Sequence, residues 1–134
     1  MDSNSVTIVL AALEQAASRG TVLPYRQFHG LFARMVPLTH RHCALEAALR
    51  VLNDAPEIDY GVLLACDNGL PGAEFFRRFQ KHRWDAYVKA MGDPRYKSAT
   101  MKGKRQLVEE DRRRVYQHAM LRQQEREREC ACLS

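Results

Sequence analysis

The amino-acid sequence predicts a mainly α protein with a small β-hairpin, built as a winged helix-turn-helix-like core followed by basic C-terminal helices. Two observations support this fold class. Apolar residues recur at three- and four-residue spacing over most of the chain, whereas residues 57–66 alternate as a strand does. The expected elements also follow the order of a winged helix-turn-helix: helix, short helix, helix, strand and turn. We therefore expect a winged-helix-like core at residues 1–92 and a basic linker with a C-terminal helix at residues 93–134.

Three helices are expected in the first half of the chain. The first covers residues 5–18 and ends before Gly20, which suits a helix C-terminus. The second starts at Pro24, because the fixed φ of proline fits the first turn of a helix. The third covers residues 39–52, with Thr39 as its N-cap. The core residues expected from these three helices are Val9, Leu10, Leu13, Tyr25, Phe28, Leu31, Phe32, Leu45, Ala48, Leu49 and Leu52.

Residues 57–66 are expected to form the strand that leads into the wing. Ile58 and Tyr60 alternate with Asp59 and Gly61, as in a half-buried strand. The apolar run that follows, VLLA, indicates burial on both faces. The next residues, DNGLPG, have the composition of a turn, because Asn-Gly accepts positive φ at little cost. Strand and turn together predict the hairpin.

Helical spacing returns after the turn. Phe76, Phe79 and Tyr87 fall on one side of a helix that is expected to start at Ala73 and to end at the Gly92-Asp93-Pro94 sequence. A last helix is expected from Leu107 onward. Its weak apolar seam consists of Val108, Val115 and Ala119. Beyond Met120 the sequence is almost wholly polar, so we expect this end to project or fray without a partner.

The charge of the chain is unevenly distributed. The formal net charge is +5, but residues 1–73 carry five basic and seven acidic side chains, whereas residues 74–134 carry sixteen basic and nine acidic ones. A cluster of Lys and Arg attracts a polyanion or an acidic protein surface, and salt weakens the attraction. The basic half is therefore the strongest functional indication in the sequence.

Twelve basic residues are the predicted nucleic-acid contacts. They neutralise phosphates, while Tyr87, Tyr96 and Tyr116 lie among them and can stack on bases. The residues are Arg41, Arg77, Arg78, Lys81, Arg83, Arg95, Lys97, Lys102, Lys104, Arg105, Arg112 and Arg113.

The alternative interpretation is a solvated helical surface whose charges pair with each other. Glu109, Glu110 and Asp111 lie one turn before Arg113 and Arg114, and residues 125–129 alternate in sign. Residues 95–105 contain no acidic residue, so this stretch carries the nucleic-acid prediction best. The third helix offers Thr39, His40, Arg41 and Arg50, which is a modest surface for reading bases.

Other classes of protein have little support. No apolar run is long enough to span a membrane, and a cytoplasmic protein is expected. His40 and His42 face different directions on a helix and make a poor metal site. Asp54, Glu57 and Asp59 resemble a helix end and a loop more than a nuclease site. No phosphate-binding glycine motif is present. We therefore expect no cofactor, no bound metal and no catalytic activity.

The segment IDYGVLLACDNGLPGAEFF resembles a strand–turn motif of the type LxxLVV…TGLPGxGF. This motif occurs in small winged-helix-like modules of bacterial defence and mobile-element accessory proteins. The resemblance rests on Gly69, Leu70, Pro71, Gly72 and Phe75 or Phe76, while Asn68 stands where such segments often have threonine. It implies a winged-helix fold and a bacterial accessory gene. It implies no catalytic residues, because the motif is structural.

Together these observations predict a non-catalytic accessory or regulatory protein that binds nucleic acid, with DNA favoured over RNA. The competing hypothesis is a protein-interaction module or inhibitor that docks on a larger nucleic-acid-processing complex, since the same basic surface suits an acidic protein face. A homodimer through the first or the last helix is compatible with either hypothesis.

Overall fold

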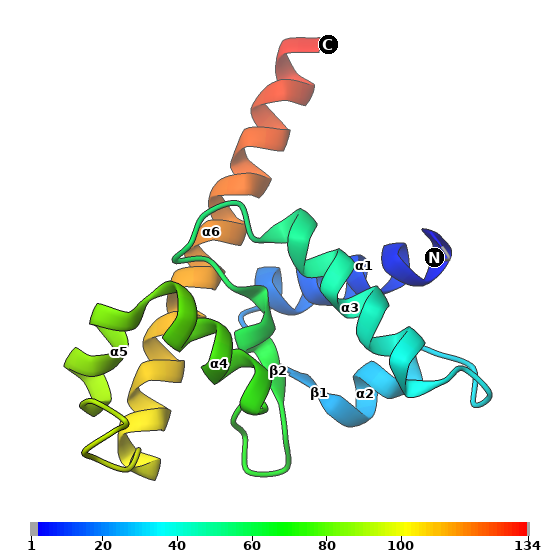
Figure 1. The fold of residues 1–134 in the computed structure, drawn as a ribbon. Coiled ribbons are helices and arrows are strands. Elements are labelled where there is room, and N and C mark those ends of the chain that lie inside the picture. The colour runs from blue at the N-terminus through cyan, green and yellow to red at the C-terminus, as the bar shows by residue number, and fades with distance from the viewer. Residues whose placement is uncertain (1–2, 134) are drawn as a thin grey trace.

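The computed structural model describes residues 3–133 and is mainly helical, which confirms the coarse fold class. Figure 1 shows the helices gathered around α6, the longest of them. In chain order the elements are α1 Ser3–Arg19, β1 Leu23–Pro24, α2 Tyr25–Gly30, α3 Leu38–Leu52, the 3-10 helix η1 Tyr60–Leu63, β2 Leu64–Ala65, α4 Ala73–His82, α5 Trp84–Met91 and α6 Met101–Leu133.

The two strands form a parallel pair, so the predicted β-hairpin is wrong. Leu23 lies opposite Leu64, and Pro24 lies opposite Ala65. Pro24 was expected to start the second helix, but Leu23 and Pro24 extend beside β2 and close the sheet. A parallel pair needs a long crossover connection, and here α2 and α3 supply it. A winged helix-turn-helix core therefore stays a prediction.

The predicted strand over residues 57–66 is also wrong for most of its length. Tyr60–Leu63 winds into η1, and only Leu64–Ala65 is a strand. The cause is local, because the Asp59 carboxylate accepts a hydrogen bond from the Gly61 amide at 2.9 Å and tightens the backbone there. The expectation that VLLA is buried is confirmed, since all four residues are buried.

Several helix boundaries differ from the prediction. α2 begins at Tyr25 instead of Pro24, and α6 begins at Met101 instead of Leu107. α3 begins at Leu38 after Pro37, and no side chain caps it, so the Thr39 cap is wrong. The single helix expected over residues 73–91 is two helices, because the backbone of Arg83 leaves the helical region between α4 and α5. The break places the Arg83 side chain against α6, where it pairs with Asp111.

The core joins α1, α3, η1 and α6. Of the core residues expected from the first three helices, Val9, Leu13, Phe28, Leu45, Ala48, Leu49 and Leu52 are buried, and the other four are partly buried. Leu107, Val108 and Val115 of α6 belong to the same cluster. The boundary at residue 92 stays a prediction, although α6 supplies part of the core that the first 92 residues build.

Helix α6 extends beyond this core. It has 33 residues, so its length is about 50 Å. Residues 123–132 are exposed, and Figure 1 shows this end projecting away from the other helices. The polar sequence after Met120 fits this exposed position, where Arg126 still pairs with Glu14 of α1 at 3.2 Å.

Gly61, in η1, leaves no room for a side chain. A Cβ there would meet the Arg78 guanidinium and would lie 2.8 Å from the Asp59 carboxylate. We expect Gly61→Ala to separate Arg78 from Asp59 and to lower the free energy of unfolding by about 1–2 kcal/mol. Urea denaturation measures the loss. Gly30→Ala, with open space around its Cβ, is the matched control, and a loss as large in this variant would contradict the explanation.

Candidate nucleic-acid interface

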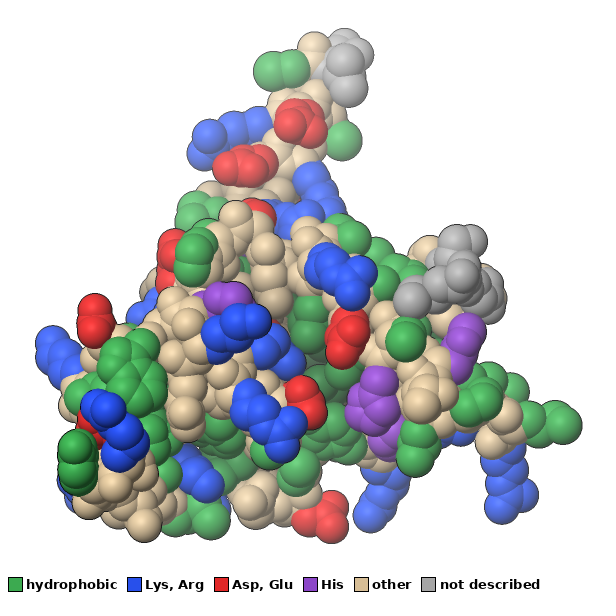
Figure 2. All heavy atoms as spheres, viewed as in Figure 1, with side chains coloured by type: hydrophobic (Ala, Val, Ile, Leu, Met, Phe, Trp, Pro, Cys, Tyr) green, Lys and Arg blue, Asp and Glu red, His purple; other side chains and the backbone are tan. Residues whose placement is uncertain are grey.

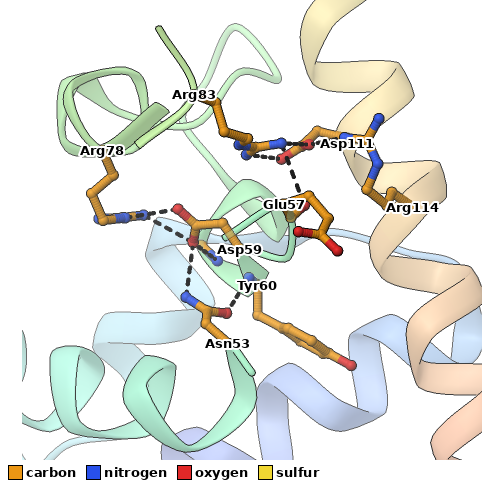
Figure 3. A network of polar contacts seen from close by, with 9 residues as sticks. Asn53, Glu57, Asp59, Tyr60, Arg78, Arg83, Asp111 and Arg114 are labelled. Carbon is orange, nitrogen blue, oxygen red and sulfur yellow. Dashed lines mark hydrogen bonds and ion pairs between the residues drawn. The ribbon is translucent and has the colours of Figure 1, made fainter. Parts of the chain in front are cut away.

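Arg83 is one of the predicted contact residues, and its side chain is only 11% exposed. Its guanidinium donates to both carboxylate oxygens of Asp111, at 2.7 and 3.1 Å, and it stacks 3.9 Å from the centre of the Phe79 ring. Arg114 pairs with the same carboxylate at 2.7 Å. Figure 3 shows the three charged side chains meeting between α4, α5 and α6. Arg83 is thus engaged in holding α6 to the rest of the fold.

Arg78 has a comparable partner in Asp59. Nε of Arg78 lies 2.8 Å from Asp59 Oδ2, and Asp59 Oδ1 also accepts from Asn53 and from the Gly61 amide. The Asn53 side-chain oxygen in turn accepts from the Tyr60 amide at 2.8 Å. This network, visible in Figure 3, satisfies a buried carboxylate at the start of η1. It engages the Arg78 guanidinium within the chain.

Arg112 binds backbone carbonyls. Its guanidinium donates to the carbonyls of Val62, Leu64 and Gly69, at 2.8, 3.3 and 2.9 Å. Burial lowers the pKa of Arg112 from its usual value, and the charges of Tyr116 and Glu109 oppose this shift. The side chain therefore fixes η1, β2 and the following turn against α6.

Arg41 has a similar role in the loop between α2 and α3. It donates to the backbone carbonyls of Val36, His29, Ala33 and Arg34, at 3.0 to 3.4 Å. One guanidinium with five donors can satisfy such a turn because the loop wraps around it. The outward orientation expected for Arg41 is not what the structure shows.

Two further predicted contacts have an acidic neighbour on the surface. Arg77 lies 2.9 Å from Glu74 and Arg95 lies 2.6 Å from Asp93. The Arg95 pair lowers the pKa of Asp93, chiefly by a side-chain hydrogen bond. Both arginines are about 70% exposed, so such pairs exchange readily with solvent and with other anions.

The remaining six predicted contacts lie within ion-pair distance of no carboxylate in residues 3–133. Five of them are exposed and Lys104 is partly buried, with its ammonium 5.4 Å from the centre of the Phe76 ring. Arg105 also donates to the backbone carbonyl of Asn68 at 3.4 Å. These residues are Lys81, Lys97, Lys102, Lys104, Arg105 and Arg113.

Four of the six cluster along the chain. Lys97 precedes α6, and Lys102, Lys104 and Arg105 lie in its first two turns. We call these four residues the basic segment. Because Arg105 reaches Asn68, the segment adjoins the turn that follows β2. Sequence reasoning located this group correctly as acid-free, and Tyr96 beside it is 84% exposed.

Basic residues that the sequence interpretation passed over lie on α2 and the loop after it. Arg26 and Arg34 are exposed. In Figure 1 the N-terminal end of α6, the turn after β2, α2 and its loop all lie along the lower edge of the molecule. In Figure 2 the Lys and Arg side chains of this face, its lower edge included, are separated by apolar, acidic and other side chains. The candidate surface therefore rests on the basic segment.

No constellation for metal binding emerges in the described part of the chain, where no group of three His, Cys, Asp or Glu side chains is placed to hold an ion. Among residues 3–133 no helix is both long and apolar enough to cross a bilayer.

Comparisons of the chain with protein-family models, with curated proteins and with solved structures gave no significant match. The resemblance to winged-helix-like accessory modules stays a prediction from the GLPG segment. The structure itself therefore describes the class of this protein. It is a small, mainly helical protein in which the basic segment lies at the N-terminal end of the longest helix.

Proposed function

We propose that the protein binds nucleic acid, DNA in particular, without catalysing a reaction on it, and that the basic segment neutralises backbone phosphates. The observation that carries the proposal is the absence of a carboxylate within ion-pair distance of Lys97, Lys102, Lys104 and Arg105 in residues 3–133. These four cations have no carboxylate partner among the described residues, so their charges are available to phosphates.

The position of the basic segment supports an anionic partner. The N-terminal end of a helix carries partial positive charge, and the first turn of α6 contains no acidic residue. A cation near a helix N-terminus costs about 0.3–1 kcal/mol. Lys102, Lys104 and Arg105 therefore lie where their charges oppose the helix dipole, and a bound phosphate would relieve this repulsion.

The surroundings of the segment suit a polynucleotide better than an isolated anion. Tyr96 offers an exposed ring for stacking on a base, and the Arg95 guanidinium lies 5.6 Å from its centre. Arg26 of α2 and Arg34 of the loop after it are further exposed basic residues. We leave Arg41, Arg78, Arg83 and Arg112 out of the proposed interface, because their partners lie within the chain.

The test is a titration of a DNA duplex at several salt concentrations. Four phosphate contacts correspond to a slope of about −3.6 in log K against log salt, so affinity should fall on the order of 100-fold between 50 and 200 mM salt. Replacing all four residues of the basic segment by alanine should reduce this slope to near zero. A protein that binds no DNA at low salt, or a quadruple variant that binds like the wild type, would refute the proposal.

A matched pair of double variants separates local contact from net charge. Lys102→Ala with Arg105→Ala should weaken binding on the order of tenfold and reduce the slope by about 2. Arg19→Ala with Arg128→Ala removes the same charge from exposed positions on other parts of the molecule. Equal losses in the two double variants would mean that only the total charge matters.

The second candidate function is the protein-interaction module. The C-terminal half of α6 favours it, since the apolar side chains of Met120 and Leu121 are each 60% exposed there. A pull-down with and without nuclease discriminates between the two functions. A partner protein that remains after nuclease treatment favours the module, whereas loss of all partners favours nucleic acid.

A further inference from the structure

Three side chains away from the basic segment, those of Asp54, His118 and Tyr60, are linked by hydrogen bonds. His118 of α6 lies 2.8 Å from the Tyr60 hydroxyl through Nδ1, and 2.9 Å from Asp54 through Nε2. In the sequence, Tyr60 lies 58 positions and Asp54 lies 64 positions from His118. Neither the core packing nor the proposed nucleic-acid contact needs this arrangement.

The direction of each hydrogen bond follows from the groups involved. An ionised carboxylate only accepts, so Nε2 of His118 carries a proton and donates it to Asp54. In a neutral imidazole Nδ1 then has no proton and accepts from the Tyr60 hydroxyl. In this arrangement the Tyr60 hydroxyl donates its hydrogen bond to His118. The lone pairs of the Tyr60 oxygen can then accept from another donor.

Arg122 lies beside this hydroxyl. Burial raises the pKa of Tyr60, and the Arg122 guanidinium beside the hydroxyl opposes the shift. Tyr60 is only 1% exposed and belongs to η1, so its hydroxyl oxygen is a fixed acceptor next to the guanidinium.

Arg122 and Tyr60 line a hollow between α1 and α6 with a volume of about 370 Å³. This lies at the lower end of the range for small-molecule sites. Its other lining residues are nearly all polar: Glu14, Gln15, Ser18, Ala119, Gln123 and Arg126. At its border Arg126 pairs with Glu14 at 3.2 Å, whereas Arg122 lies within ion-pair distance of no carboxylate in residues 3–133. The hollow is thus lined by one arginine, Arg122, that has no ion-pair partner among residues 3–133.

We propose that this hollow binds a small oxyanion, a carboxylate or phosphate group, through the guanidinium of Arg122, with the hydroxyl of Ser18 and the amides of Gln15 and Gln123 as further donors. A guanidinium matches the two oxygens of either group with parallel hydrogen bonds. A hydroxyl and two side-chain amides supply further donors around the same space, and the phenol oxygen is an acceptor next to the guanidinium.

The site is separate from the proposed nucleic-acid interface. Arg122 comes 17 residues after Arg105 on α6, which corresponds to about 25 Å along the helix axis. At this distance the two sites do not share a phosphate. A ligand in the hollow would contact α1, η1 and α6 together, so it would add contacts between elements that the fold already brings together.

The experiment uses inorganic phosphate and acetate as probes, added to the isotope-labelled full chain at constant ionic strength. We expect saturable shifts in the amide resonances of Ser18 and Gln123, and the stronger of the two probes identifies the chemistry. Arg122→Gln should weaken this binding at least tenfold. Arg128→Gln, which removes an exposed arginine from the projecting end of α6, should leave it unchanged.

A third variant tests the positioning role of Tyr60. Tyr60→Phe keeps the ring and removes the oxygen, so probe affinity should fall several-fold while the pattern of shifts is retained. Shifts that do not saturate, or that Arg122→Gln leaves intact, would overturn the proposal. So would a DNA duplex that shifts the same resonances and loses affinity in Arg122→Gln, since the hollow would then be a nucleic-acid contact. The basic-segment variants measure the proposed function independently of these results.

Discussion

Asp111→Ala is expected to lower the free energy of unfolding by about 3–5 kcal/mol. Asp111 is 1% exposed and Arg83, its partner, has a side chain 11% exposed. Without the carboxylate the Arg83 guanidinium stays in the interior with no counter-charge, and Arg114 loses its partner as well. A loss of this size is a large fraction of the total stability of a small domain.

Thermal unfolding measures the effect, as a decrease of about 10–20 °C in Tm. Glu110→Ala removes a carboxylate from the exposed neighbouring position and should change stability by less than about 0.5 kcal/mol. Replacing both partners, with Asp111→Leu and Arg83→Met, should recover much of the loss, because no charge is left buried. If Asp111→Ala unfolds like the wild type, the ion pair does not hold α6 in place.

Arg112→Ala is expected to lower the free energy of unfolding by about 2–4 kcal/mol, since hydrogen bonds from a charged donor contribute about 1.5–3 kcal/mol and three carbonyls lose theirs. Val62 and Leu64 are fully or almost fully buried, so water replaces the lost donor poorly. The midpoint of a urea titration reports the change.

The neighbouring residue is the control. Arg113 is exposed and lies within ion-pair distance of no carboxylate in residues 3–133. Arg113→Ala should therefore leave stability nearly unchanged. From the sequence both arginines are predicted nucleic-acid contacts. In the structure Arg112 binds backbone carbonyls, whereas Arg113 is exposed. An Arg112→Ala variant that is as stable as wild type, but binds DNA less well, would return Arg112 to the interface.

The parts of the fold that depend on local spacing could be predicted from the sequence. Leu45, Ala48, Leu49 and Leu52 recur at helical intervals, and each is buried as expected. The β-hairpin failed because the partner of Leu64 is Leu23, which precedes two helices. Spacing within a window shows that a segment is extended or helical. It does not show which distant segment lies beside it.

The candidate site was predicted in part for the same reason. Residues 95–105 were recognised from the absence of acidic neighbours in the sequence, which is a local property. The partner of Arg78 is 19 residues away, that of Arg83 is 28 away and the first carbonyl bound by Arg112 is 50 away. Such pairings exist only after the chain has folded, so the twelve candidates could not be divided in advance into structural and available cations.

The position of α6 after the other described elements has a consequence for biosynthesis. A ribosome synthesises residues 3–91 before the helix that covers η1 and pairs with Arg83 has been made. At about 5–20 residues per second, the nascent chain spends seconds with that apolar surface and Arg83 uncovered. Among the described elements α6 is thus translated after all the others, and a message truncated before Val115 would yield a chain that lacks part of its core.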